Sequence, residues 1–122
     1  MNRGRDAEAR AEAHLVAAGL QPVCRNYRCR SGEIDLVLRD GDTLVIVEVR
    51  HRSRDSHGGA AASVDRHKQR RIIGAARHYL GQAAHGDPPA VRFDVVCIDG
   101  DQAIDWIPSA FEASEYLSLI HI

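Results

Sequence analysis

The sequence has few aromatic residues, few cysteines and no long apolar run, and each shortage excludes a class of protein. Aromatic residues make up 5% of the 122 residues, and the three cysteines, Cys24, Cys29 and Cys97, form no Cys-x-x-Cys pair. An odd number of cysteines at such spacings predicts free thiols in a reducing cytoplasm. No apolar run approaches the roughly 18 residues that span a bilayer, and no apolar segment typical of a secretory signal follows the basic N-terminus. We therefore expect a cytoplasmic location and no membrane partner.

Lysine is also nearly absent, and the arginines that replace it are unevenly distributed. Lys68 is the one lysine, and residues 24–78 hold 12 of the 16 Lys/Arg although the net charge is −1. The guanidinium group offers paired donors that suit phosphate, so we expect a surface that binds nucleic acid. An ordinary solvated surface is the alternative interpretation. The candidate nucleic-acid-binding residues are Arg25, Arg28, Arg30, Arg52, Arg54, Arg70 and Arg71.

Hydrophobic periodicity predicts one α/β domain over residues 1–122. Helical spacing favours helices over 6–18, with Asp6 as N-cap, and over 64–84, with Ser63 as N-cap. The expected fold has a mixed central sheet of about five strands flanked by helices, because a helix between strands permits a parallel crossover. Strands are predicted at 21–30, 92–99 and 103–107, and residues 32–50 are predicted to form two strands joined by a tight turn, with a loop at 51–62.

Finer expectations concern single positions in these strands. Asp40-Gly41-Asp42 predicts a hairpin turn, and the apolar run that follows it predicts a central strand covered on both faces. Pro108 is expected to end the last strand, with a short helix beginning at Ser109. Cys24 and Cys29 are five residues apart, which predicts that they face opposite ways on their strand.

Acidic residues gather on the hairpin of residues 32–50. Glu33 and Asp35 share one face of the first strand, and Glu48 and Arg50 share one face of the second. Clustered carboxylates require a metal ion, a cation or raised carboxyl pKa values. The Asp35 and Glu48 carboxylates and the Val49 carbonyl are hard oxygen ligands, which suit Mg²⁺ or Mn²⁺. The hairpin is therefore the expected metal site.

The chain resembles the restriction-endonuclease-like superfamily, whose signature is Asp…(Asp/Glu)-x-Lys. More narrowly, it is similar to the YraN-like family of uncharacterised bacterial proteins, which are predicted endonucleases. The matching segments are RNYRCRSGEIDLVLRDGDTLVIVEVR, SVDRHKQRRIIGAARHYL, RFDVVCIDG and IPSAF, which cover most of residues 4–111, and the tail 112–122 lies outside the resemblance. Holliday-junction resolvases of the same superfamily carry a glutamate on the first helix, a place that Glu8 matches.

The resemblance implies a metal-dependent endonuclease that hydrolyses nucleic-acid phosphodiester bonds, with branched or structured DNA as the expected substrate and DNA preferred over RNA. A homodimer is left open. The implied metal ligands are Asp35, Glu48 and Val49. The implied catalytic residues are Glu8, Glu33, Asp35, Glu48, Arg50 and Lys68.

One position departs from the signature, because Arg50 stands where the superfamily has lysine. Arginine stays protonated and cannot serve as a base, although it can stabilise developing negative charge. Lys68, near the inner face of the following helix, is an alternative source of the missing ammonium group. The competing interpretations are a catalytically impaired module that binds nucleic acid with the same fold, and a scaffold protein.

Overall fold

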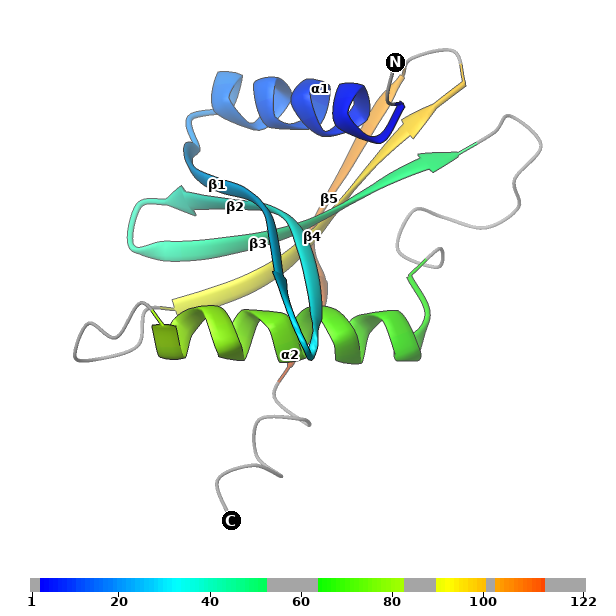
Figure 1. Cartoon of the computed structure of the whole chain (residues 1–122). Helices are drawn as coiled ribbons and strands as arrows, with labels where there is room; N and C mark the ends of the chain where they lie inside the picture. The colour runs from blue at the N-terminus through cyan, green and yellow to red at the C-terminus, as the bar shows by residue number, and fades with distance from the viewer. Residues whose placement is uncertain (1–2, 53–63, 83–89, 101–102, 114–122) are drawn as a thin grey trace.

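The computed structural model describes residues 3–52, 64–82, 90–100 and 103–113 (Figure 1). One five-stranded sheet has the order β1-β2-β3-β4-β5, in which β3 and β4 are parallel and the other neighbours are antiparallel. The expected α/β class and the parallel crossover are therefore confirmed. The elements in chain order are α1 (Arg3–Ala17), β1 (Gln21–Cys29), β2 (Gly32–Asp40), β3 (Thr43–Arg52), α2 (Arg66–Gln82), β4 (Ala90–Asp99) and β5 (Ile104–Phe111).

The two helices cover opposite faces of the sheet, with α1 on one side and α2 on the other (Figure 1). Leu15 of α1 packs in a core cluster with Leu38 and Val47, whereas Ile73 of α2 packs with Ile46 on the other face. Strand β3 contributes to both clusters, which confirms that it is central and covered on both faces. Within the described ranges, no helix is long and apolar enough to cross a membrane.

Both helix starts differ from the prediction. Helix α1 begins at Arg3, so Asp6 lies in the first turn, where the helix dipole favours a negative charge, and not at the N-cap. Helix α2 begins at Arg66, and its cap is Asp65, whose Oδ1 accepts the Lys68 backbone N–H at 2.8 Å. Ser63, the predicted cap, lies outside the described residues.

Strand β5 continues past Pro108 to Phe111, so the predicted stop and the helix from Ser109 were wrong. Proline is tolerated because β5 is an edge strand that needs donors on one side only. Ser109 has a φ of 51°, and the pairing with β4 shifts register between Phe93 and Val95. A bulge at this edge therefore replaces the expected helix start.

Strand β1 contains a second backbone irregularity, at Asn26, whose φ is 54°. Cys24, Tyr27 and Cys29 all pack against the cluster beneath α2. The prediction that Cys24 and Cys29 face opposite ways was wrong, because the left-handed residue between them resets the alternation of the strand. All three cysteines are free thiols, as expected.

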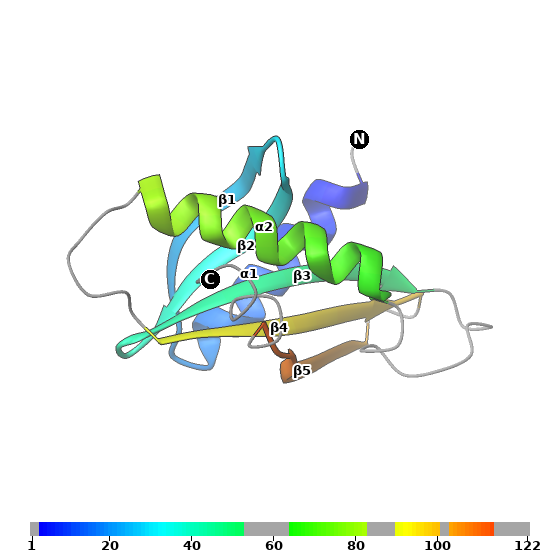
Figure 2. The ribbon, with the colours of Figure 1, turned by 90° about the horizontal axis from the view of Figure 1, so that it is seen from below.

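The sheet splits between β2 and β3, and this split positions the candidate site. Their pairing runs from Asp40–Thr43 to Leu36–Val47 and ends there. Beyond that point the β1–β2 hairpin bends toward α2, while β3 continues beside β4 as far as Arg52 (Figures 1 and 2). His51 and Arg52 thus belong to β3 and not to the predicted loop, whose residues 53–62 lie outside the described ranges.

Candidate functional site

Asp35 lies at the point where β2 and β3 separate. Its Oδ2 accepts the backbone N–H of Val49 at 2.8 Å, so a side chain replaces the next hydrogen bond of the β2–β3 ladder. Glu48 is the neighbour of Val49 on β3, and its carboxyl is close enough to Asp35 for a hydrogen bond between the two side chains. The strand split therefore brings together the two acids that the hairpin pattern indicated.

Glu48 is buried, with an exposed fraction of 3%, and two cations approach the same carboxyl oxygen. Lys68 Nζ lies 3.1 Å from Oε2 of Glu48, and the Arg50 guanidinium lies 3.5 Å from it. Burial and the charge of Asp35 raise the pKa of Glu48 to about 7, although Lys68 opposes the rise. This carboxyl therefore changes its charge near neutral pH.

Glu8 reaches Asp35 from α1, on the other side of the sheet from Lys68. Burial raises the pKa of Glu8, and the Asp35 carboxylate raises it further. A hydrogen bond with Asn26 opposes these effects. Asn26 was not singled out from the sequence; an asparagine inside a strand signals a left-handed position, which it tolerates better than most residues. Three carboxyl groups from α1, β2 and β3 thus meet around Asp35.

Lys68 of α2 is the cation nearest to the Glu48 carboxylate. The Asp65 cap fixes the first turn of α2, and this turn carries Lys68 toward the carboxylate. The ammonium group of Lys68 lies closer to Glu48 than the guanidinium of Arg50 does.

Other predicted residues form surface ion pairs or are exposed. Glu33 is exposed and pairs with Arg28 at 3.2 Å, and Arg25 pairs with Glu12 at 2.6 Å. Arg30, Arg70 and Arg71 are exposed, so they are accessible to a ligand. Arg54 lies outside the residues that the structure describes, and so does the side chain of Arg52.

The exposed arginines of α2 belong to a helix without negative charge. Residues 66–82 contain no Asp or Glu, and Lys68 and Arg70 lie on the same helix as Arg66, Arg71 and Arg77. A helix with charges of one sign attracts polyanions, but the binding of nucleic acid at this helix stays a prediction.

The oxygen donors at the strand split are of the type that magnesium prefers. Among the described residues, no three His, Cys, Asp or Glu side chains are arranged to hold a metal. Mg²⁺ is commonly held by one or two carboxylates, with water and substrate phosphate completing its shell. Asp35, Glu48 and the Val49 carbonyl are hard oxygen donors of that kind. Burial is the largest cause of the raised pKa values of Glu8 and Glu48, and the charge of Asp35 adds to it.

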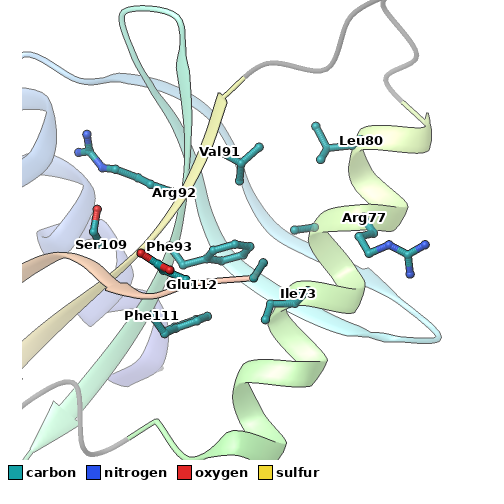
Figure 3. Close-up of a pocket in the computed structure, with 11 residues that line it drawn as sticks. Ile73, Arg77, Leu80, Val91, Arg92, Phe93, Ser109, Phe111 and Glu112 are labelled. Atoms are coloured by element: carbon teal, nitrogen blue, oxygen red, sulfur yellow. The ribbon is translucent and has the colours of Figure 1, made fainter. Parts of the chain in front are cut away.

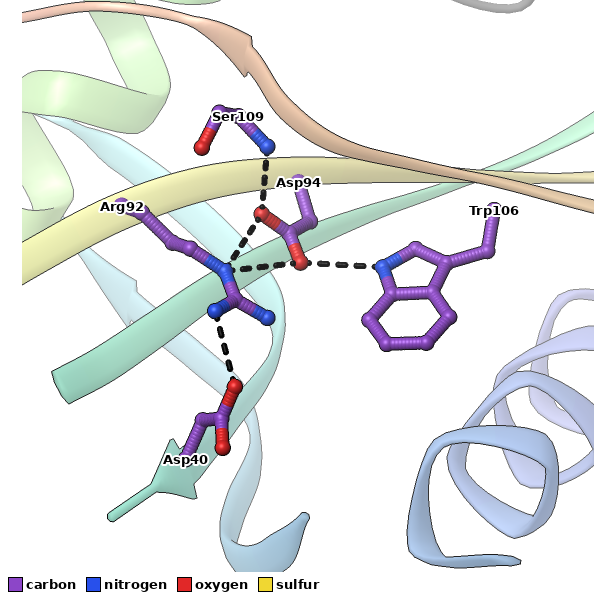
Figure 4. A network of polar contacts seen from close by, with 5 residues as sticks. All are labelled: Asp40, Arg92, Asp94, Trp106 and Ser109. Carbon is purple, nitrogen blue, oxygen red and sulfur yellow. Dashed lines mark hydrogen bonds and ion pairs between the residues drawn. The ribbon is translucent and has the colours of Figure 1, made fainter. Parts of the chain in front are cut away.

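A second buried acid was missed in the sequence. Asp94 of β4 is fully buried and accepts hydrogen bonds from Arg92 Nε at 3.1 Å, Trp106 Nε1 at 2.9 Å and the Ser109 N–H at 2.9 Å (Figure 4). Arg92 also donates to Asp40 Oδ2 at 2.9 Å. The signal was an arginine two residues before an acid inside an apolar strand, since such residues share a face. This network joins β4 to β5 and to the β2–β3 turn.

A cavity of about 360 Å³ lies between the C-terminal half of α2 and strands β4 and β5 (Figure 3). Its lining is mostly apolar, with Phe93, Phe111, Leu80 and Ile73, and Arg77 and Glu112 also line it. None of the acids at the strand split contributes to this lining. The cavity is thus separate from the candidate site.

Comparison with known sequences identifies the family of this chain. The profile of the uncharacterised protein family UPF0102 matches residues 7–98. The chain belongs to this family. The match includes Glu8, Asp35, Glu48 and Lys68 and ends before β5.

Relatives in the UPF0102 family are similar over most of their length. A UPF0102 protein of Aeromonas hydrophila subsp. hydrophila is 60% identical over 111 residues, which cover 90% of this chain and 85% of the relative. A UPF0102 protein of Dechloromonas aromatica is 54% identical over 114 residues, which cover 93% and 91%. These names state no activity, so a function has to be argued from the site.

Proposed function

We propose that this UPF0102 protein is a metal-dependent endonuclease with a restriction-endonuclease-like fold, which hydrolyses phosphodiester bonds in branched or structured DNA. The observation that carries the proposal is the Lys68 ammonium group 3.1 Å from Glu48, beside a split in the sheet where Asp35 and Glu48 meet. Two acids and a lysine in contact reproduce the chemical content of the signature although position 50 is arginine.

In this proposal Asp35, Glu48 and the Val49 carbonyl hold Mg²⁺ or Mn²⁺. Such an ion, when bound, lowers the pKa of water and neutralises charge on a phosphodiester. Glu8 supports the site through its contact with Asp35. Because a carboxyl group must be ionised to bind a cation, the raised pKa of Glu48 makes ion binding weaker in acid.

Lys68 stabilises the extra negative charge of the phosphorane-like transition state. Its side chain is 38% exposed, so it can contact a substrate while it remains beside Glu48. An ammonium group is a compact charge that approaches an attacking oxygen closely, which the planar fork of Arg50 does less well. Arg50 then acts as an additional electrostatic group at the same carboxylate.

The exposed arginines hold the nucleic-acid backbone near these groups. Arg28 and Arg30 lie near the tip of the β1–β2 hairpin, and Arg70 and Arg71 lie on α2 one turn or less from Lys68. Contacts of this kind position a duplex without reading its sequence. We therefore expect recognition of nucleic-acid shape, and binding that weakens with salt.

Cleavage of radiolabelled junction, flap and single-stranded DNA with Mg²⁺ or Mn²⁺ tests the proposal. The wild-type protein should cut at least one substrate, and Asp35→Ala and Glu48→Ala should not. Arg39→Ala is the matched control, because it removes an exposed charge from β2 away from the site. Cleavage that persists in both acid variants would point to a contaminating nuclease and remove the basis of the proposal.

A second candidate function is a nucleic-acid-binding module without cleavage. The observation that favours it is that two cations, Lys68 and Arg50, already approach the same oxygen of Glu48 and offset its charge. Binding of the same DNA substrates in metal-free buffer, with no cleavage in either metal, would select this function. Absence of binding as well would leave the scaffold interpretation.

A further inference from the structure

The β1–β2 hairpin needs a support beyond the sheet. Its pairing with β3 ends at Leu36–Val47, so the segment from Asp35 to the tip at Gly32 has only β1 as a strand neighbour. A two-stranded hairpin is marginally stable by itself. The position of Asp35 therefore depends on what the tip of this hairpin contacts.

Two glycines allow the tip of the hairpin to lie close to α2. A Cβ atom added at Gly32 would overlap the backbone carbonyl of Arg71, and one added at Gly74 would lie 2.9 Å from the Cβ of Ser31. Real Cβ atoms do not come so close, so each glycine permits a close approach between the hairpin and the helix. We refer to Ser31, Gly32, Arg71 and Gly74 as the hairpin–helix seam.

Tyr27 extends the same contact along α2. Its hydroxyl is hydrogen-bonded to Nδ1 of His78, and its ring meets the ring of Tyr79 edge-on at a centroid distance of 5.2 Å. Aromatic pairs of this geometry are stabilising. The hairpin is thus held on α2 at its tip and at its side.

The seam connects the two halves of the site. Asp35 lies three residues after Gly32 on β2, and Lys68 lies three residues before Arg71 on α2. Glu48 of β3 contacts both Lys68 and Asp35. A shift of the tip along or away from α2 would therefore change the position of Asp35 relative to the other two groups.

We infer that the hairpin–helix seam positions Asp35 against Glu48 and Lys68, with Gly32 and Gly74 as positioning residues. The effect of the seam on catalysis rests on the proposed function, whereas its effect on the position of Asp35 does not. A misplacement of about 1 Å in a catalytic group can reduce the rate on the order of 100-fold.

Hydrogen exchange of the Val49 amide reports whether Asp35 keeps its place, because Val49 N–H donates to Asp35 Oδ2 at 2.8 Å. In NMR exchange experiments, Gly32→Ala and Gly74→Ala should each speed this exchange by about tenfold, as local opening becomes easier. Gly41→Ala and Gly81→Ala are matched controls. Gly41 has a positive φ and Gly81 is in α2, but an added Cβ at either meets nothing within 4 Å.

Cleavage kinetics provide the second readout. Gly32→Ala and Gly74→Ala should each reduce kcat on the order of 100-fold, because Asp35 is displaced from Glu48 and Lys68. Ser31→Gly removes the atom that Gly74→Ala would meet, so the double variant should recover both Val49 protection and kcat. A merely destabilised helix would not be rescued in this way.

The outcomes separate the two proposals. Val49 exchange at the wild-type rate in folded Gly32→Ala and Gly74→Ala would overturn the positioning role. If either single variant cannot fold, the double variant Ser31→Gly with Gly74→Ala still tests it: failure to recover Val49 protection would also overturn the positioning role. Faster Val49 exchange in the seam variants of a protein that cuts no substrate would support the positioning role and reject the endonuclease.

Discussion

Glu48 of β3 and Asp94 of β4 are both buried carboxyl groups on adjacent strands with cations beside them, but only Glu48 also lies next to another acid. Asp94 is met by donors alone, from Arg92, Trp106 and Ser109. Glu48 shares its environment with Asp35, and its pKa is raised to about 7. A buried acid surrounded by donors stabilises a fold, whereas one held beside another acid is costly and is typical of a functional site.

The largest loss of stability is expected in Asp94→Ala, which tests whether the buried Asp94 stabilises the fold. Asp94→Ala would leave the Trp106 and Ser109 donors without their acceptor, and Arg92 would keep only Asp40. Removing one member of such a buried pair costs about 3–5 kcal/mol of unfolding free energy. Urea denaturation would measure this loss, with Asp105→Ala as a control at an exposed aspartate on β5. A loss below that of the control would show that Asp94 does not stabilise the fold.

Lys68→Ala tests whether the site around Glu48 takes part in cleavage. Removing the ammonium group from Glu48 should reduce kcat by about 10²–10³-fold, or roughly 3 kcal/mol, because one donor to developing charge is lost. Stability should fall less than in Asp94→Ala, because Arg50 remains beside Glu48 and the Lys68 side chain is 38% exposed. Single-turnover cleavage and urea denaturation of the same sample separate the two effects. Cleavage at the wild-type rate would exclude Lys68 from the site.

The dependence of stability on pH tests the raised pKa of Glu48. The pKa of Glu48 in the folded protein is about 7, against 4.5 for an unperturbed glutamate. The folded state therefore binds more protons than the unfolded state between these values, and stability falls as pH rises through this window, by up to about 3 kcal/mol. Denaturation at pH 5 and pH 8 measures the difference. Glu48→Gln should flatten the curve, and an equally steep curve in that variant would assign the titration to another group.

Trp106→Phe weakens the Asp94 network without removing its acid. The variant loses the donor at 2.9 Å from Asp94 Oδ2, and a hydrogen bond to a charged group contributes about 1.5–3 kcal/mol. Thermal unfolding should show the lower end of that range, because Arg92 and Ser109 remain as donors. Cleavage should be unaffected, and a parallel loss of cleavage would mean that the two regions are coupled.

The smallest effect is expected at Arg50→Lys. If Lys68 already provides the ammonium group, a second lysine should raise Mg²⁺-dependent cleavage only a few-fold, or less than about 1.4 kcal/mol. Steady-state cleavage measures the change, and Arg50→Ala separates loss of arginine from gain of lysine. An increase of several orders of magnitude would mean that Lys68 does not replace the signature lysine.

The elements that were predicted from the sequence are those with a strong local signal. The helix–three strands–helix–two strands order follows from periodicity, and the Asp40-Gly41-Asp42 turn follows from its residues, with Gly41 at a φ of 60°. The failures lie where tertiary contacts override local signals. Pro108 does not end β5, because an edge strand tolerates it, and Asn26 changes which way Cys24 and Cys29 face.

The sequence by itself determined the candidate residues of the site: three acids on one hairpin, a glutamate on the first helix and a single lysine on the second. Only the tertiary structure decided which of these meet. The split between β2 and β3 brings Asp35 to Glu48 and leaves Glu33 paired with Arg28 on the surface. The docking of α2 selects Lys68 as the closer cation to Glu48, because burial and packing place side chains that no local spacing can bring together.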